Sequence, residues 1–411
     1  MYRQPGESEG RKLDYKSCEQ CLEVSRPIAR TMYGWNTPDG VPRGAGCTAG
    51  DIVSGNRLRL YSPATLIFSI CELLGFLIVS STVFSMLINL LTSDFKFEPS
   101  LKPVANFDAS TDCELLRKAM KGIGTDENAI INIMGRRSAT QRNTIVTQFK
   151  AMYGKDLISE FKSELSGHFY DCVRALCYLP EEFDAVQLYE AMKGAGTDED
   201  TLIEILCSRT NEQIAMIKES FTKLYNKDLE KEIVSETSRH FKRVLVSLLQ
   251  ASRDENPNVD LHAAKSEAEK LYKAGEKQLG TDESQFLSIL CTRSYEQLRA
   301  IFDEYKKLTK HDIEQALKSE MSGDLLNAFL AIVSCARNKP KYFAQLLEKS
   351  MKGLGTSDQM LIRIVVSRCE IDMGRIKKEF QAAYGKSLAT WIKDDTSGDY
   401  ERLLLTLIGE R

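Results

Sequence analysis

Four glycine loops, each followed at a fixed distance by an acidic residue, are the parts of this sequence best suited to chemistry. The loop at 120–125 reads Met-Lys-Gly-Ile-Gly-Thr. The same pattern, with another residue between the glycines, recurs at 192–197 and 351–356, and a looser version occupies 275–281. Forty residues after the last glycine of each loop stands a carboxylate, in order Glu164, Glu236, Glu320 and Asp395. Because the distance is the same in all four copies, we interpret loop and acid as one unit.

The chemistry that these residue types favour is the binding of a hard cation through oxygen atoms. Glycines allow the backbone to turn its carbonyl groups inward, and a distant carboxylate can add two more oxygens. Such an all-oxygen site of irregular geometry suits Ca²⁺, whereas Mg²⁺ needs a stricter octahedron. Positions left open on the ion could be filled by water or by a lipid phosphate. We expect Thr125 and its counterparts to cap the helix that follows each loop.

The loop tips indicate a membrane as the second partner. The tip residues are apolar where a solvated loop would be polar, and each has a lysine beside it, which suits insertion at a lipid interface. The tips are Ile123, Ala195, Leu279 and Leu354, with Lys121, Lys193, Lys277 and Lys352 as neighbours. The formal net charge of −3 argues against a nucleic-acid partner, so a bound cation would have to supply the attraction to acidic phospholipid.

The same spacing extends to residues that would support the loops. An arginine lies thirteen residues after each reference glycine and an aromatic residue lies twenty-five after it. Fixed-period similarity of this kind predicts stacked copies of one unit. Within each copy apolar residues recur at helical spacing, and no alternating strand pattern occurs. We therefore predict an all-α fold of four repeats with five short helices each, in which the repeated arginines form structural ion pairs.

From about Val104 to Arg411, the repeated K-G-x-G-T motif with its acid resembles the annexin family. The resemblance implies four five-helix repeats in a slightly curved disc that binds acidic phospholipid, such as phosphatidylserine, reversibly through calcium sites on its convex face. It also implies the ligands of each site. They would be the carbonyls of Met120, Gly122 and Gly124 with Glu164, those of Met192, Gly194 and Gly196 with Glu236, those of Gly275, Gln278 and Gly280 with Glu320, and those of Met351, Gly353 and Gly355 with Asp395.

The resemblance further implies a central polar channel lined by Asp184 with Arg209 and by Glu204 with Arg363. A buried ion-pair network is the alternative for these four residues. Ser357 departs from the family pattern, because the other copies carry aspartate at this position.

The sequence divides into a Gly-, Pro- and Ser-rich region at 1–63, predicted to be disordered, an apolar segment at 64–91, a linker at 92–107 and the repeats. The repeats are expected at 108–178, 180–250, 263–335 and 339–410. A long connector at 252–258 suggests two halves of two repeats each.

The apolar segment leaves the localisation open. With Glu72 as its one charge, it is long enough to span a membrane as a single helix. It is either a membrane anchor, a helix covered by the repeats, or sequence foreign to the natural protein. The basic residues before it would place the repeats outside the cytoplasm, whereas scattered cysteines indicate a reducing compartment.

We therefore expect a cytoplasmic protein that binds membranes reversibly. The alternative is an integral membrane protein that conducts ions. Neither a nucleophile with a base nor a phosphate-binding loop motif occurs, so the sequence does not indicate an enzyme.

Overall fold

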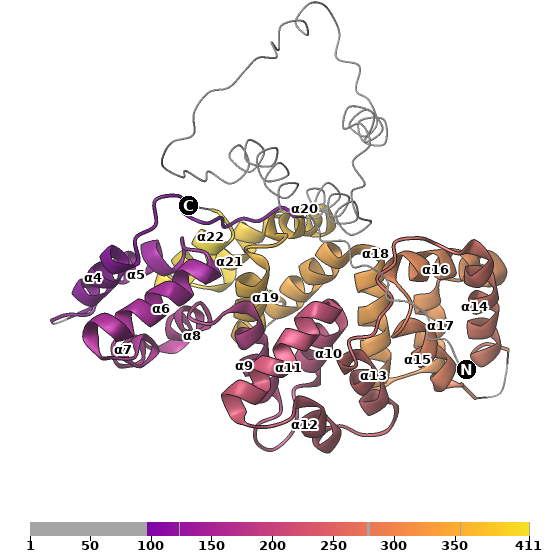
Figure 1. The fold of residues 1–411 in the computed structure, drawn as a ribbon. Helices are drawn as coiled ribbons and strands as arrows, with labels where there is room; N and C mark the ends of the chain where they lie inside the picture. Colours follow the sequence, from indigo (N-terminus) through magenta and orange to yellow (C-terminus); the bar gives the residue numbers. More distant parts are fainter. Residues whose placement is uncertain (1–96, 123, 278–279, 354, 411) are drawn as a thin grey trace, which may run out of the picture. The chain divides into compact units, whose positions relative to one another are not determined.

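The computed structural model describes residues 97–122, 124–277, 280–353 and 355–410 (Figure 1). All of them belong to the larger of two compact units, Met86–Arg411. The predicted disordered region at 1–63 and the apolar segment at 64–91 lie outside the described residues. In the described part the regular structure is helical and strands are absent, which confirms the predicted all-α class.

Repeat 1 contains the five predicted helices. They are α4 (Ala109–Ala119), α5 (Glu127–Met134), α6 (Ala139–Tyr153), α7 (Leu157–Glu164) and α8 (Gly167–Ala175). Four of these helices, α4 to α7, begin at side chains that cap their free N–H groups. Asp108 accepts from the amides of Ser110 and Thr111, and Ser138 forms a capping box with Gln141. Gly154 then ends α6 in the left-handed conformation, with φ of 66°.

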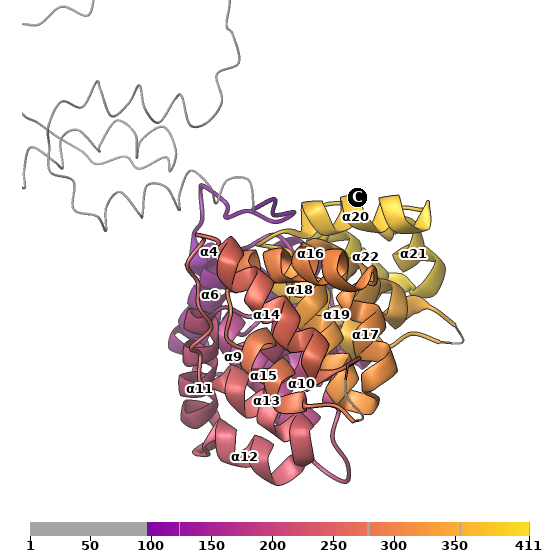
Figure 2. The same ribbon diagram turned by 90° about the vertical axis from the view of Figure 1, so that its right-hand side faces the viewer.

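Repeat 2 follows the same order of helices. They are α9 (Pro180–Ala191), α10 (Glu199–Ser208), α11 (Asn211–Tyr225), α12 (Leu229–Glu236) and α13 (Arg239–Leu249). Repeat 3, which faces the viewer in Figure 2, adds α14 (Leu261–Ala274), α15 (Glu283–Leu290), α16 (Tyr295–Thr309), α17 (Ile313–Glu320) and the first half of α18 (Gly323–Met351). Repeat 4 comprises the second half of α18 with α19 (Asp358–Arg368), α20 (Met373–Tyr384), α21 (Leu388–Asp395) and α22 (Gly398–Leu407).

The junction of repeats 3 and 4 differs from the other junctions. Helix α18 runs through it, and only Asn338, with φ of −161° and ψ of 93°, leaves the helical conformation. Two features of the sequence explain the kink. Pro340 cannot donate a backbone hydrogen bond, and the side chain of Asn338 accepts from the amide of Lys341 at 3.1 Å, so that it caps the second half. The boundary expected between the repeats at 263–335 and 339–410 is therefore a kink within one helix rather than a loop.

The repeats pack against one another in pairs, and these pairs differ from those suggested by the long connector at 252–258. Helices α5 and α8 of repeat 1 contact α19 and α22 of repeat 4, while α13 of repeat 2 contacts α15 and α18. Repeat 1 thus pairs with repeat 4, and repeat 2 with repeat 3. The expectation of two halves formed by consecutive repeats was therefore wrong. The connector contacts both repeats that it joins, since the side-chain amide of Asn211 in repeat 2 donates to the carbonyl of Arg253 at 2.7 Å. Arg253 donates to the carbonyls of Leu290 and Arg293 at 2.9 and 2.8 Å.

The segment before α4 fastens repeats 4 and 1 together. The amides of Glu98 and Ser100 donate to the carbonyls of Ile371 and Cys369 at 3.0 and 2.9 Å. Farther along, Val104 exchanges two hydrogen bonds with the side chain of Gln141 in repeat 1.

Within the described ranges, no helix combines the length and apolar character needed to cross a membrane.

Candidate metal centre

The glycine loops adopt the backbone conformation that their glycines allow. In repeat 1, Gly122 and Gly124 have φ of 117° and 87°, and the corresponding pairs in repeats 2 and 4 fall between 90° and 112°. These values lie in a region that residues with a Cβ rarely enter. The loop also closes on itself, because the amide of Asp126 donates to the carbonyl of Ala119 at 2.9 Å. Repeats 2, 3 and 4 repeat this closure at 2.7–2.9 Å.

Each loop is tied to its distant acid through the threonine hydroxyl group. Thr281 Oγ1 donates to Glu320 Oε2 at 2.8 Å, and Thr125 and Thr197 approach Glu164 and Glu236 at 3.3 and 3.5 Å. In repeat 4, Thr356 makes the same contact with Asp395. The structure thus brings together, in every repeat, the loop and the acid that the sequence places forty residues later.

The threonines do not cap the following helices, so that prediction was wrong. The cap is the next residue in each loop: the side chain of Asp126 accepts from the amide of Ala129, and Asp198 and Asp282 act in the same way. Both residue types are good caps, but the threonine hydroxyl is engaged by the acid. In repeat 4 the cap position is Ser357, whose side chain makes no capping hydrogen bond. The replacement of aspartate by Ser357 in repeat 4 therefore coincides with the loss of the side-chain cap.

The four acids share one position in the fold. Each is the last residue of the short fourth helix of its repeat, at the ends of α7, α12, α17 and α21. Among the described residues, no three His, Cys, Asp or Glu side chains converge on a point where they could hold a metal. A cation bound by the ligands named from the sequence would have one acidic side chain, and backbone carbonyls, water or an external anion would have to supply the remaining ligands.

The methionines proposed as carbonyl ligands have buried side chains. Met120, Met192 and Met351 are 4–7% exposed and fix the start of their loops in the hydrophobic core. Lys121, Lys193, Lys277, Lys352 and the tip residue Ala195 are exposed. The other tips, Ile123, Leu279 and Leu354, and the proposed ligand Gln278 lie outside the described residues.

In the third loop the first glycine packs directly against the acid. Gly275 is buried and has φ of −113° and ψ of −104°. A Cβ at this position would lie 3.4 Å from Glu320 Cγ and 3.3 Å from Phe286. Gly275 is therefore needed for close packing, not for a positive φ.

An acidic cavity of about 480 Å³ joins the candidate sites of repeats 1 and 4, and the sequence did not indicate it. It is lined by Glu164 and Asp395 together with His168 and Tyr400. The sequence alone indicates only an ordinary surface or core residue at His168, because the four histidines share no spacing typical of a metal site. The structure places its Nε2 atom 3.2 Å from Asp358 Oδ2 in repeat 4. Burial raises the pKa of the Tyr400 hydroxyl group above its ordinary value.

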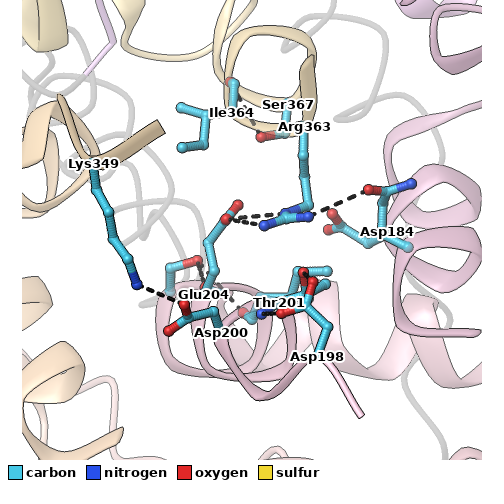
Figure 3. A network of polar contacts seen from close by, with 12 residues as sticks. Asp184, Asp198, Asp200, Thr201, Glu204, Lys349, Arg363, Ile364 and Ser367 are labelled. Atoms are coloured by element: carbon cyan, nitrogen blue, oxygen red, sulfur yellow. Dashed lines mark hydrogen bonds and ion pairs between the residues drawn. The ribbon is translucent and has the colours of Figure 1, made fainter. Parts of the chain in front are cut away.

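The residues proposed for a central channel form two buried ion pairs. Arg209 donates to both carboxylate oxygens of Asp184 at 2.6 and 2.7 Å within repeat 2. Arg363 of repeat 4 reaches Glu204 of repeat 2 at 2.7 and 3.0 Å, as Figure 3 shows. Burial alone would lower the pKa of Arg209, but the facing carboxylate of Asp184 raises it. The second oxygen of Glu204, Oε1, has no hydrogen-bond partner in the described part of the chain.

The repeated arginines form the structural ion pairs predicted for them. Arg137 binds Asp112 through two hydrogen bonds of 2.7 and 2.8 Å, and Arg293 binds Glu267 at 2.6 Å. Together with Arg209, they link the second helix of a repeat to the first.

Comparison with known proteins agrees with this architecture. A sequence model described as "Annexin" matches residues 111–176, 183–248, 266–332 and 342–407. Mouse annexin A4 is 52% identical over 310 residues, which cover 75% of this chain and 97% of that protein. Human annexin A11 is 50% identical over 317 residues, 77% of this chain, but this chain spans only 63% of that protein's length. The solved structure of annexin III matches with a TM-score of 0.75 and 46% identity over 76% of this chain and 98% of its own.

With four helical repeats, four glycine loops and these matches, the chain belongs to the annexin family. The family is known for calcium-dependent binding of phospholipid. A solved structure titled "calcium-bound annexin (Sm)1" is 33% identical to this chain, with a TM-score of 0.69 over 76% of this chain and 93% of its own.

Proposed function

We propose that this protein binds acidic phospholipid membranes, of the phosphatidylserine type, through Ca²⁺ held at the four loop and carboxylate sites. The observation that carries the proposal is the contact between loop threonine and distant acid, which occurs in all four repeats. It fixes one carboxylate beside each set of loop carbonyls, which is the donor set that suits Ca²⁺.

The ligands in this proposal are those named from the sequence. In repeat 1 they are the carbonyls of Met120, Gly122 and Gly124 with Glu164, and repeats 2 and 4 use the same positions. In repeat 3 the carbonyls of Gly275, Gln278 and Gly280 act with Glu320. Since each site has a single acidic side chain, the bound ion keeps a net positive charge and open coordination positions, and lipid phosphate fills them.

The exposed loop lysines and apolar tips add to the attachment. Lysines near an anionic bilayer contribute about 1 kcal/mol each, and apolar tips gain from entering the interface. The protein then binds the membrane reversibly on its cytoplasmic side, and the calcium concentration controls this binding. Under this proposal the protein is a binding protein rather than an enzyme.

The buried pairs Asp184 with Arg209 and Glu204 with Arg363 have a structural role in this proposal. Each charge has an opposite partner within hydrogen-bond distance, so the pairs hold repeat 2 together and join it to repeat 4. The family channel remains the alternative for these residues.

Cosedimentation with phosphatidylserine vesicles tests the proposal. We expect the full chain to sediment with vesicles in calcium and to stay in the supernatant when a chelator is present, whereas phosphatidylcholine vesicles should bind little in either condition. Equal sedimentation with and without chelator would contradict it. Carbonate extraction of the membrane fraction is the companion measurement, since a peripherally bound protein is released and an integral one is retained.

A further inference from the structure

The fifth helix of repeat 2 begins with a charge pattern that the other repeats lack. Helix α13 starts Arg-His-Phe-Lys-Arg at 239–243, whereas α8, α18 and α22 start Gly-His-Phe-Tyr-Asp, Gly-Asp-Leu-Leu-Asn and Gly-Asp-Tyr-Glu-Arg. Counting histidine as neutral, the first turn of α13 carries three positive charges and no negative one. The same positions in each other repeat have a net charge of −1. Repeat 2 thus reverses the sign of charge at this place.

The three cations of α13 have no side-chain partner among the residues that the structure describes. In the described part of the chain, the side chains of Arg239, Lys242 and Arg243 make neither a hydrogen bond nor an ion pair. Arg402 of repeat 4, at the position of Arg243, instead bonds Asn128 and Asp399. Arg239 and Arg243 are exposed and Lys242 is half-buried. Three unpaired cations on one turn repel one another, and an anion from outside the protein would relieve this repulsion.

The position of these cations relates them to the loops. Arg239 follows the acid Glu236 of the repeat 2 site by three residues, and α13 begins where α12 ends. On the other side, His240 Nε2 lies 4.0 Å from Glu283 Oε2, the first residue after the third loop and its cap. The turn therefore lies between the candidate calcium sites of repeats 2 and 3.

Arg239 has a left-handed backbone conformation, in which its side chain points to solvent. Its φ is 53°, and the equivalent residues Gly167, Gly323 and Gly398 have φ of 59°, 61° and 66°. A side chain at those glycines would meet no atom within 4 Å, so the position opens to solvent. Repeat 2 thus holds an arginine in a conformation that favours glycine, at a site where the side chain gains no internal contact.

We infer that Arg239, Lys242 and Arg243 form a cationic patch that binds the phosphomonoester head group of a membrane lipid beside the calcium of repeat 2. A phosphomonoester carries more than one negative charge near pH 7 and three acceptor oxygens, which arginine binds through paired hydrogen bonds. Phosphatidylserine suits the patch less, because its head group adds an ammonium group that the cations repel. The inference rests on the proposed function, to which it adds a lipid preference located in repeat 2.

The test compares phosphatidic acid with phosphatidylserine in vesicles of equal total charge, measuring the calcium concentration for half-maximal sedimentation of the full chain. We expect the natural chain to need about fivefold less calcium on phosphatidic acid. The variant Arg239→Gly, Lys242→Gln, Arg243→Gln should lose this preference. It should fold, because glycine occupies the position of Arg239 in every other repeat.

Two control variants separate the patch from net charge and from folding. Lys150→Gln, Lys223→Gln, Lys307→Gln removes the same charge from exposed residues on the third helices and should keep the preference. The second control, Arg239→Lys, Lys242→Arg, Arg243→Lys, keeps the charge and should keep most of the preference for phosphatidic acid.

Three outcomes would overturn the inference. The first is that the natural chain needs equal calcium concentrations on the two lipids. The second is that the variant Arg239→Gly, Lys242→Gln, Arg243→Gln keeps the preference for phosphatidic acid. Displacement from vesicles by soluble glycerol phosphate at matched phosphate concentration would assign the patch to a soluble ligand instead of a membrane. If no variant sedimented with either lipid in calcium, the proposed function itself would fail, and the two failures are thereby distinguished.

Discussion

Thr281 donates a hydrogen bond of 2.8 Å to Glu320, a residue thirty-nine positions later at the end of another helix. The same pairing joins Thr125 to Glu164, Thr197 to Glu236 and Thr356 to Asp395. A carboxylate that accepts such a bond is held in one orientation before any ion arrives, and residues that orient a metal ligand in this way affect metal affinity strongly.

Removing the four hydroxyl groups should therefore weaken calcium binding while leaving the acids in place. We expect the variant with valine at positions 125, 197, 281 and 356 to bind calcium about tenfold more weakly, as measured by calorimetry with vesicles present. Serine at the same positions keeps the hydroxyl and is the matched control. Equal affinities for the valine and serine variants would show that the hydroxyl groups do not position the acids.

Removing the acids themselves should have a larger effect. Changing Glu164, Glu236 and Glu320 to glutamine and Asp395 to asparagine should lower calcium affinity by more than tenfold without unfolding the chain, because all four acids lie at helix ends outside the core. The control changes one other acid in each fourth helix to its amide, namely Glu160, Glu230, Glu314 and Asp394. Circular dichroism checks folding, and unchanged affinity would mean that the ligands are misplaced.

The ion pair formed by Glu204 and Arg363 should contribute measurably to the free energy of unfolding. Both side chains are almost fully buried, at 1% and 3% exposure, so Arg363→Met leaves a buried carboxylate without a partner and should cost about 3–5 kcal/mol. The double variant Glu204→Met, Arg363→Met should recover most of this loss. Urea denaturation measures both. A stable Arg363→Met variant would argue that water already reaches Glu204, as a channel requires.

The cysteines of the repeats should resist alkylation in the folded protein. The seven cysteines that the structure describes are free and buried. Burial raises the pKa of the Cys113 thiol to about 11 and that of Cys369 to about 12. We expect these thiols to react with iodoacetamide at pH 8 only after denaturation, with peptide mass spectrometry locating the modified residues. Rapid modification of Cys369 in the native chain would contradict its burial.

The raised thiol pKa values also predict the direction of a pH effect. Below pH 9 the thiols are protonated in both states, and their contribution to stability is fully present. As the pH rises from 9 through about 11 for Cys113 and about 12 for Cys369, the unfolded chain ionises first, so this contribution is lost. Replacing Cys369 with alanine should reduce the loss, measured as the difference in urea midpoint between pH 8.5, which lies below this range, and pH 10.5, which lies within it.

Much of the fold follows from local sequence signals. The spacing of apolar residues between breakers predicts five helices in repeat 1, among them 128–134 and 156–165, and the structure ends these two helices at Met134 and Glu164. The apolar pattern predicts that the first helix begins at Glu114. It begins earlier, at Ala109, because its cap Asp108 precedes the apolar residues that the pattern detects.

Contacts between distant residues could not be predicted in the same way. Aspartate and threonine are both good caps, so only the contact with the acid shows that Thr125 leaves this role to Asp126. The position of His168 beside Asp358 depends on the packing of repeat 1 against repeat 4, which no spacing within a repeat reveals. Connector length was misleading for the same reason, since it does not determine which repeats become neighbours.

The pairing of the first repeat with the last has a consequence for how such a chain can end. In an open array of repeats, both terminal units expose a face that would otherwise be covered, and special capping units are needed to keep it soluble. Here α8 and α5 cover α19 and α22, so the outermost units serve as each other's caps. A protein of this kind cannot lose or gain a single unit at either end without uncovering apolar surface at the opposite one.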